Sequence, residues 1–204
     1  MTLAYEERVD LADFLATLTP QEWQAPSLCA RWTVKDVVAH VVSYEELSAF
    51  GLAKRFAKGR VVRANEVGVR EFAPLSPYEL VNFLREHLHP RGLTAAFGGM
   101  IGLVDGTVHH QDIRRALGRS RAVPAERLER VLPLVPGNPR LGAGRRIRGL
   151  RVAANDIDWQ HGDGPEVTGP AEALLMAMTG RPDAVAQLSG AGVATLAGRI
   201  TVRS

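Results

Sequence analysis

Two short segments about seventy residues apart carry ionisable side chains where a helix would be expected to present apolar ones. The first, residues 31–40, ends in His40, and the second, residues 105–112, contains Asp105, His109 and Asp112. Burying a carboxylate or an imidazole on an apolar helix face is costly unless the group is paired or bound to a metal. A fold that packs the two helices side by side meets this constraint.

Helical geometry allows His40, Asp105 and His109 to converge. At about 100° per residue, His40 borders the apolar arc of residues 34–42, while Asp105, His109 and Asp112 fall on one stripe. Asp105 and His109 are one helical turn apart, a spacing that presents two ligands to one ion. Three nitrogen and oxygen ligands leave a divalent metal with open positions, which catalysis requires. A buried His–Asp pair without metal explains the same spacing, so both interpretations stay open.

The other candidate residues have weaker patterns. Asp112 is predicted to orient either His109 or His110, and His110 is expected to be exposed or to neighbour the site. His87 lies on an apolar stripe, where it is either a core histidine or a ligand. Cys29 is the single cysteine, which excludes an intramolecular disulfide. It is expected to be structural, because only Arg31 nearby would lower its pKa.

Helix signals dominate the first two thirds of the chain. Thr33 with Asp36, and Ser76 with Glu79, are typical of helix N-termini. Glycines and charges in residues 51–70 instead predict a helix end, a loop and a short helix. The Pro- and Gly-rich stretch around residues 136–144 separates these helices from a shorter mixed segment. We predict a mainly α protein, with a four-helix bundle over residues 1–135 and a small α+β domain over residues 145–204.

Composition narrows the class of protein. The chain has 204 residues, of which 46% are hydrophobic and 23% charged, as is usual for a soluble globular protein. Neither a membrane span nor a signal-peptide pattern is visible, and one cysteine fits a reducing compartment, so we expect a cytoplasmic protein. The net charge of +3 comes from arginines spread along the chain without a nucleic-acid-binding motif. We therefore expect no nucleic-acid or membrane partner.

Several segments together resemble a known family. Residues 26–40 and 108–118 are similar to the two signatures of the mycothiol-dependent maleylpyruvate isomerase family, part of the DinB-like metal-binding superfamily. Residues 155–175, with Gly180 and Arg181, are similar to the family's C-terminal domain. The likeness follows the same order along most of the chain.

This resemblance implies a DinB-like up-down four-helix bundle that binds one divalent metal, usually zinc, through His–Glu–His. The first histidine falls on His40, the last on His109, and the middle ligand on Asp105, where aspartate replaces the family's glutamate. Mycothiol is the implied thiol cofactor. The metal would stabilise its thiolate, which would attack a small electrophilic substrate.

Two functions from different classes follow. One is a metal- and mycothiol-dependent isomerase or S-transferase, with a small-molecule thiol and an electrophilic substrate as partners, acting as a monomer or homodimer. The other is a non-catalytic module that binds a metal or a small ligand on the same scaffold, which the aspartate at position 105 motivates.

Overall fold

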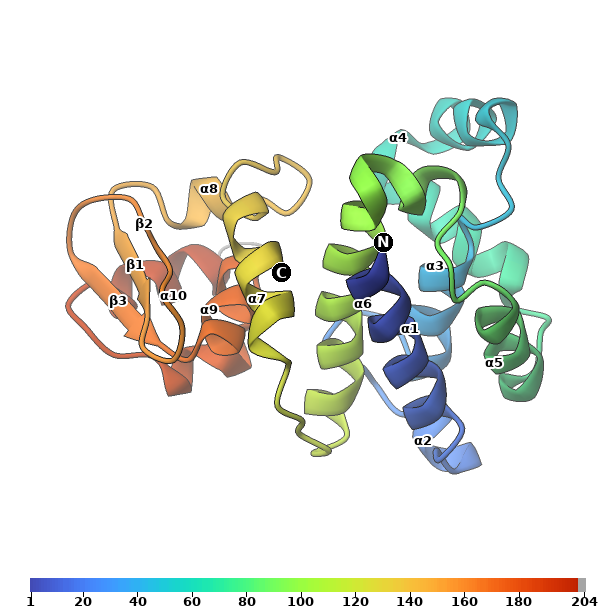
Figure 1. Cartoon of the computed structure of the whole chain (residues 1–204), viewed down its shortest axis with the longest axis horizontal. Helices are drawn as coiled ribbons and strands as arrows, with labels where there is room; N and C mark the ends of the chain where they lie inside the picture. Colours follow the sequence, from blue (N-terminus) through green and yellow to red (C-terminus); the bar gives the residue numbers. More distant parts are fainter. Residues whose placement is uncertain (202–204) are drawn as a thin grey trace. The chain divides into compact units, whose positions relative to one another are not determined.

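The computed structural model describes residues 1–201, apart from the side chains of residues 49, 58–63 and 201. The chain folds into two compact units, Met1–Arg121 and Ala122–Ser204. The first unit is a helical bundle and the second combines short helices with a small sheet (Figure 1). The predicted fold class is therefore confirmed. The domain limits of 1–135 and 145–204 stay a prediction, because compactness alone does not define an independently folding domain.

Unit 1 is built from helices around an apolar core. Their ranges are α1 (Thr2–Leu15), α2 (Pro20–Gln24), α3 (Val34–Val42), α4 (Ala49–Phe72), α5 (Pro77–Glu86), the short 3₁₀ helix η1 (Gly92–Ala95) and α6 (Ala96–Ala116). The core is formed where α1, α3 and α5 meet, with Val34, Val37, Leu11 and Leu80 almost fully buried. Because α6 packs on both α1 and α3, its side chains can reach both helices.

The predicted helix starts are confirmed by their hydrogen bonds. Asp36 N donates to Thr33 Oγ1 (3.2 Å), while Thr33 N donates to Asp36 Oδ2 (2.9 Å). Ser76 and Glu79 form the same reciprocal pair at the start of α5. Such boxes satisfy amide groups that a helix N-terminus leaves unpaired. The cap at Thr33 fixes where α3 begins and thus which face carries His40.

The prediction of a loop within residues 51–70 is wrong, because α4 continues through this stretch. Gly68 within this stretch serves helix packing rather than chain reversal. A Cβ atom at Gly68 would lie only 2.4 Å from Ser43 Oγ, at the end of α3. Glycine at this position therefore allows α4 to approach α3 closely.

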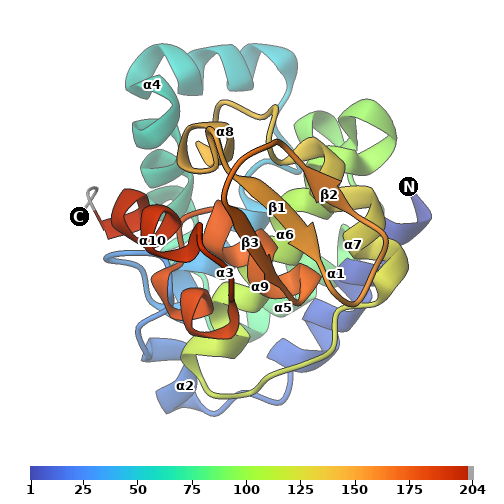
Figure 2. The same ribbon diagram turned by 90° about the vertical axis from the view of Figure 1, so that its left-hand side faces the viewer.

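Unit 2 contains a three-stranded sheet with strand order β2-β1-β3. Strands β1 (Arg151–Ala154) and β3 (Glu166–Gly169) are parallel, with Val152 opposite Val167, and β2 (Gln160–His161) pairs antiparallel to β1. Figure 2 shows the sheet beside the helices of this unit. Those helices are α7 (Ala125–Val131), η2 (Leu132–Leu134), α8 (Ala143–Arg146), α9 (Ala171–Met178), η3 (Pro182–Gln187) and α10 (Val193–Thr201). None of the helices in the described part of the chain is long and apolar enough to cross a membrane.

A buried charged cluster joins α1 to α6. His110 is fully buried, so the expectation of an exposed residue is wrong. Its Nδ1–H donates to Glu7 Oε1 (2.9 Å), and its Nε2 accepts from Arg114 Nε (2.8 Å). Burial and the positive charges of Arg121 and Arg114 lower the pKa of His110 to about 4. His110 is thus neutral near pH 7, and the cluster fixes the rotation of α6.

We predict that Glu7 makes the fold acid-sensitive. Burial by itself raises the pKa of Glu7, but hydrogen bonding from His110 and the charge of Arg121 outweigh it, and the pKa falls to about 2. A carboxyl group with a lowered pKa stabilises the fold at pH values above its ordinary pKa of 4.5. This contribution to the free energy of unfolding disappears as the pH falls to about 2. The loss should be roughly 3 kcal/mol, measured by urea unfolding across this pH range.

The Glu7→Gln variant tests this assignment. It should be less stable than the wild type near neutral pH and should show a flatter pH dependence between pH 4.5 and pH 2. Glu86→Gln on the exposed side of α5 is the control and should keep the wild-type slope. A wild-type slope in Glu7→Gln would contradict the assignment.

Candidate metal centre

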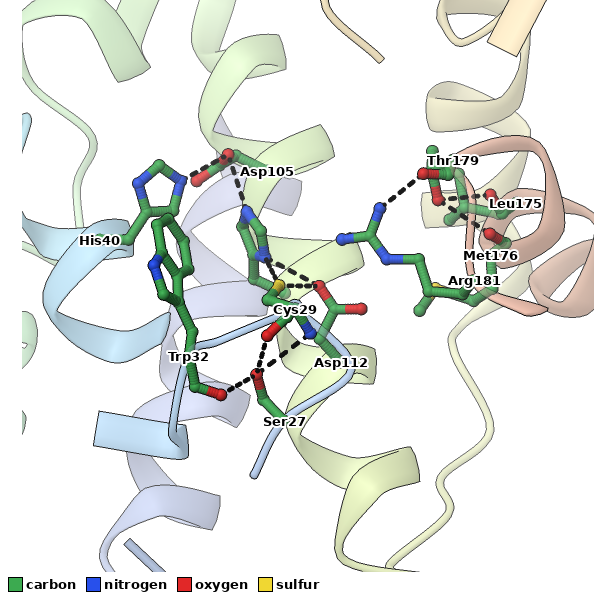
Figure 3. A network of polar contacts seen from close by, with 11 residues as sticks. Ser27, Cys29, Trp32, His40, Asp105, Asp112, Leu175, Met176, Thr179 and Arg181 are labelled. Carbon is green, nitrogen blue, oxygen red and sulfur yellow. Dashed lines mark hydrogen bonds and ion pairs between the residues drawn. The ribbon is translucent and has the colours of Figure 1, made fainter. Parts of the chain in front are cut away.

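Three side chains from two helices meet at one point in unit 1. His40 lies near the end of α3 and points toward Asp105 of α6 (Figure 3). His109 lies one turn after Asp105 on α6. His40 is buried, and the side chains of His109 and Asp105 are 13% and 32% exposed. The structure thus brings together the three residues singled out in the sequence, at a place that solvent reaches through Asp105.

The interatomic distances at this point suit ligands of one ion. Asp105 Oδ1 lies 3.5 Å from His40 Nε2 and 3.5 Å from His109 Nε2. Good hydrogen bonds between nitrogen and oxygen are about 2.7–3.2 Å long, so both separations are too wide. Ligand atoms about 2.1 Å from a tetrahedral ion lie about 3.4 Å apart. The spacing therefore fits a shared metal better than direct hydrogen bonding.

The electrostatics of the cluster favour a positive charge between these groups. Burial by itself raises the pKa of Asp105, but the adjacent imidazoles outweigh it and hold that pKa well below its usual range. Burial also lowers the pKa of His109, yet Asp105 outweighs it and raises the pKa well above its usual range. The ionised carboxylate between two imidazoles thus attracts positive charge, which is a proton on His109 when no metal is bound.

Asp112 fixes the orientation of His109. The His109 Nδ1 atom lies 2.9 Å from Asp112 Oδ2, and the Asp112 side chain is fully buried. A buried carboxylate accepts from Nδ1–H, so the neutral form of the ring carries its lone pair on Nε2, which faces Asp105. Carboxylate–histidine pairs of this kind support histidine ligands in metal sites. Of the two histidines considered for Asp112, the structure selects His109.

Cys29 lies beside this pair, contrary to the expectation that only Arg31 would be near it. Its Sγ lies 3.0 Å from Asp112 Oδ2 and 3.5 Å from His109 Nδ1. The thiol donates to the buried carboxylate, which also accepts from His109 Nδ1–H. Cys29, His109 and Asp112 also have ligand-type atoms, but all three of their separations are hydrogen-bond distances. We therefore assign them to support of the centre rather than to a second ion.

Aromatic side chains enclose His40. The ring of Trp32 lies 5.2 Å from the His40 ring and that of Tyr44 lies 5.9 Å from it, centroid to centroid. Tyr44 is held by a hydrogen bond from its hydroxyl to Asn65 Oδ1 on α4. His40 Nδ1 is buried and has no hydrogen-bond partner within the described residues. His40 is therefore oriented by packing, whereas His109 is oriented by hydrogen bonding.

His87 is a core histidine rather than a ligand. Its Nδ1 lies 2.8 Å from the carbonyl oxygen of Phe83, and the two rings stack at 4.3 Å. His87 directly follows α5, and a ring nitrogen bonded to the carbonyl oxygen four residues earlier needs no metal to satisfy it. Sequence reasoning did not identify the supporting roles of Trp32, Tyr44 and Cys29, although Trp32 and Cys29 stand within the segment that precedes His40.

Comparisons with known proteins agree with the fold of the chain. Residues 4–91 match the family model described as the mycothiol maleylpyruvate isomerase N-terminal domain. Two crystal structures of the mycothiol-dependent maleylpyruvate isomerase, one of them of a histidine-to-alanine mutant, are similar to this chain. They have TM-scores of 0.62 and 0.63 at 15% sequence identity, covering 93% of this chain and 90% of theirs. At this identity they show a shared fold. No curated protein matches the sequence.

We predict that Asp112→Asn weakens binding of a metal at this centre about 10–100-fold, the usual effect of losing a carboxylate behind a histidine ligand. Asparagine keeps the size of the side chain but removes the charge that holds the Nδ1–H tautomer of His109. Competition with a zinc chelator measures the affinity. Asp13→Asn on the exposed side of α1 is the control. Unchanged zinc affinity in Asp112→Asn would contradict the role of Asp112.

Proposed function

We propose that this chain, whose residues 4–91 match the family model of the mycothiol maleylpyruvate isomerase N-terminal domain, is a metal- and mycothiol-dependent isomerase or S-transferase. Its substrate is a small electrophile. The observation that carries the proposal is the position of Asp105 Oδ1, 3.5 Å from one imidazole nitrogen on each of two helices. We choose mycothiol as the thiol because the structural neighbours are both structures of a mycothiol-dependent isomerase.

The donor set supports a divalent metal, and we propose zinc. Two imidazole nitrogens and one carboxylate oxygen are ligands of catalytic zinc sites, where a fourth position stays open. Aspartate is one methylene shorter than the glutamate that the family uses at the middle position. The side chain of Asp105 nevertheless reaches the point between His40 and His109, so its length does not argue against the site.

A bound divalent metal would supply stabilisation of a thiolate at neutral pH. The protein's own residues would prepare the site for it. Asp112 holds the Nδ1–H of His109, and so leaves Nε2 free to bind. Trp32 and Tyr44 pack around His40 and restrict access of water to its buried ring. The Cys29 thiol is engaged with Asp112, so we assign the nucleophile to the external thiol.

A non-catalytic binding module remains the second candidate, because aspartate stands where the family has glutamate. This module would bind a metal or a small ligand on the same scaffold without turnover, whereas the enzyme requires a metal at His40, Asp105 and His109. We retain as predictions a cytoplasmic location, a monomer or homodimer, and no nucleic-acid partner.

We predict about one zinc ion per chain in protein purified without chelator, and loss of most of it in His40→Ala and His109→Ala. Each substitution removes one of three ligands, which leaves too few donors for tight binding. Elemental analysis by mass spectrometry measures the metal. His161→Ala, which removes an exposed histidine of unit 2, should keep its zinc. Equal zinc in all four proteins would eliminate the proposed centre.

We predict metal-dependent turnover of mycothiol with a small electrophile such as a maleyl or halogenated compound. Removing zinc should lower the rate at least about a hundredfold, because the thiol then loses the ion that stabilises its thiolate. Loss of free thiol and formation of product are followed by chromatography, and restoring zinc should restore the rate. Zinc-loaded protein that turns over none of these substrates would instead favour the binding module.

A further inference from the structure

Arg31 occupies a backbone position that ordinarily requires glycine. Trp32 N donates to the carbonyl oxygen of Cys29 (3.0 Å), which closes a four-residue turn with Arg31 in third place. The φ angle of Arg31 is +69°, in the left-handed region. Turns with this conformation at the third residue strongly prefer glycine, since a Cβ atom is disfavoured there. Such an outlier beside a candidate site points to a function for the side chain.

The turn is anchored to the candidate metal centre on both sides. Cys29 Sγ contacts Asp112 Oδ2 at 3.0 Å, and the Trp32 ring packs against His40. Leu28 N also donates to the main-chain oxygen of Asp112 (3.3 Å). Because neighbouring Cα atoms are about 3.8 Å apart, the backbone of Arg31 is held at the rim of the centre.

The guanidinium group of Arg31 is available to a ligand. Its side chain is 85% exposed, and its ion pair with Glu66 on α4 is long, at 4.0 Å. Glu66 also lies 3.8 Å from Arg70, so it retains a cationic partner if Arg31 moves. Exposed ion pairs of this kind contribute little to stability. A planar guanidinium, in contrast, binds a carboxylate through two parallel hydrogen bonds.

We infer that Arg31 binds a carboxylate group of the ligand at the metal centre and makes the site selective for anionic ligands. This inference rests on the proposed function, because it places the ligand at His40, Asp105 and His109. A divalent ion held by one carboxylate and two neutral imidazoles keeps a net positive charge. Arg31 adds a second positive charge at the rim, with geometry suited to a carboxylate.

The test uses maleate, a small unsaturated dicarboxylate, as the probe. Its binding to the zinc-loaded full chain is measured by isothermal titration calorimetry, alongside its uncharged dimethyl ester. Arg31→Gln should weaken maleate binding about tenfold, the effect of losing hydrogen bonds from a charged group, and should leave binding of the ester unchanged. The maleate affinity of Arg31→Lys should lie between those of the wild type and Arg31→Gln, because lysine keeps the charge without the paired donors.

Arg70→Gln is the matched control, since Arg70 is 80% exposed and also pairs with Glu66. It should change maleate affinity by less than about twofold, given the weak screened effect of a surface charge. Equal weakening in both glutamine variants would overturn the inference in favour of a general charge effect. An unchanged Arg31→Gln, or wild-type protein that binds the ester as well as maleate, or binds no maleate, would also overturn it.

Two further measurements separate a ligand role from a structural one. Arg31→Gly should raise the melting temperature, because glycine relieves the left-handed strain, while it weakens maleate binding as much as Arg31→Gln does. A fall in melting temperature with retained maleate affinity would contradict the inference. If wild-type protein holds no zinc, the proposed function fails. The same maleate titrations on zinc-free protein then decide the role of Arg31. A tenfold weaker maleate affinity in Arg31→Gln than in the wild type supports the role, and equal affinity overturns it.

Discussion

The orientation of α6 depends on the pairing of charges that its packing removes from water. On one side, His110 lies between Glu7 and Arg114; on the other, His109 lies between Asp105 and Asp112. An unpaired charge in either place would cost several kcal/mol. The rotation of α6 that satisfies one cluster also satisfies the other. The geometry of the candidate metal centre is therefore determined by ion pairs in the core and by the apolar stripes of the helices.

The two clusters differ in how completely their groups are bonded. Both ring nitrogens of His110 have close partners, and Glu7 accepts from His110 and Arg121. Such a network favours rigidity and offers no free position to a ligand. At the other cluster, both Nε2 atoms lie beyond hydrogen-bond distance from Asp105, which is partly open to solvent. This difference explains why His110 has a structural role, whereas its neighbour His109 on the same helix belongs to the candidate metal centre.

The sequence predicted those features that depend on local periodicity. Helix starts at Thr33 and Ser76 follow from capping chemistry, and the i, i+4 spacing of Asp105 and His109 follows from the helical turn. The environments of His110 and Cys29 could not be predicted in this way. The partner of His110 is Glu7, more than a hundred residues earlier, and the partner of Cys29, which lies in a turn, is Asp112 on α6. A helical wheel shows which side chains share a face, whereas it does not identify the helix or loop that covers that face.

The complete bonding around His110 also has a consequence for how this protein can change during evolution. Replacing only one of Glu7, His110, Arg114 or Arg121 leaves a buried group without its partner, whereas replacing the set by apolar residues of similar volume can be tolerated. These positions are therefore expected to vary together or not at all among related chains. Asp105 is under a weaker restriction, because an ion can shift to meet a carboxylate on a shorter or longer side chain. Lineages could thus exchange aspartate and glutamate at the site more readily than they could alter the ion pairs behind it.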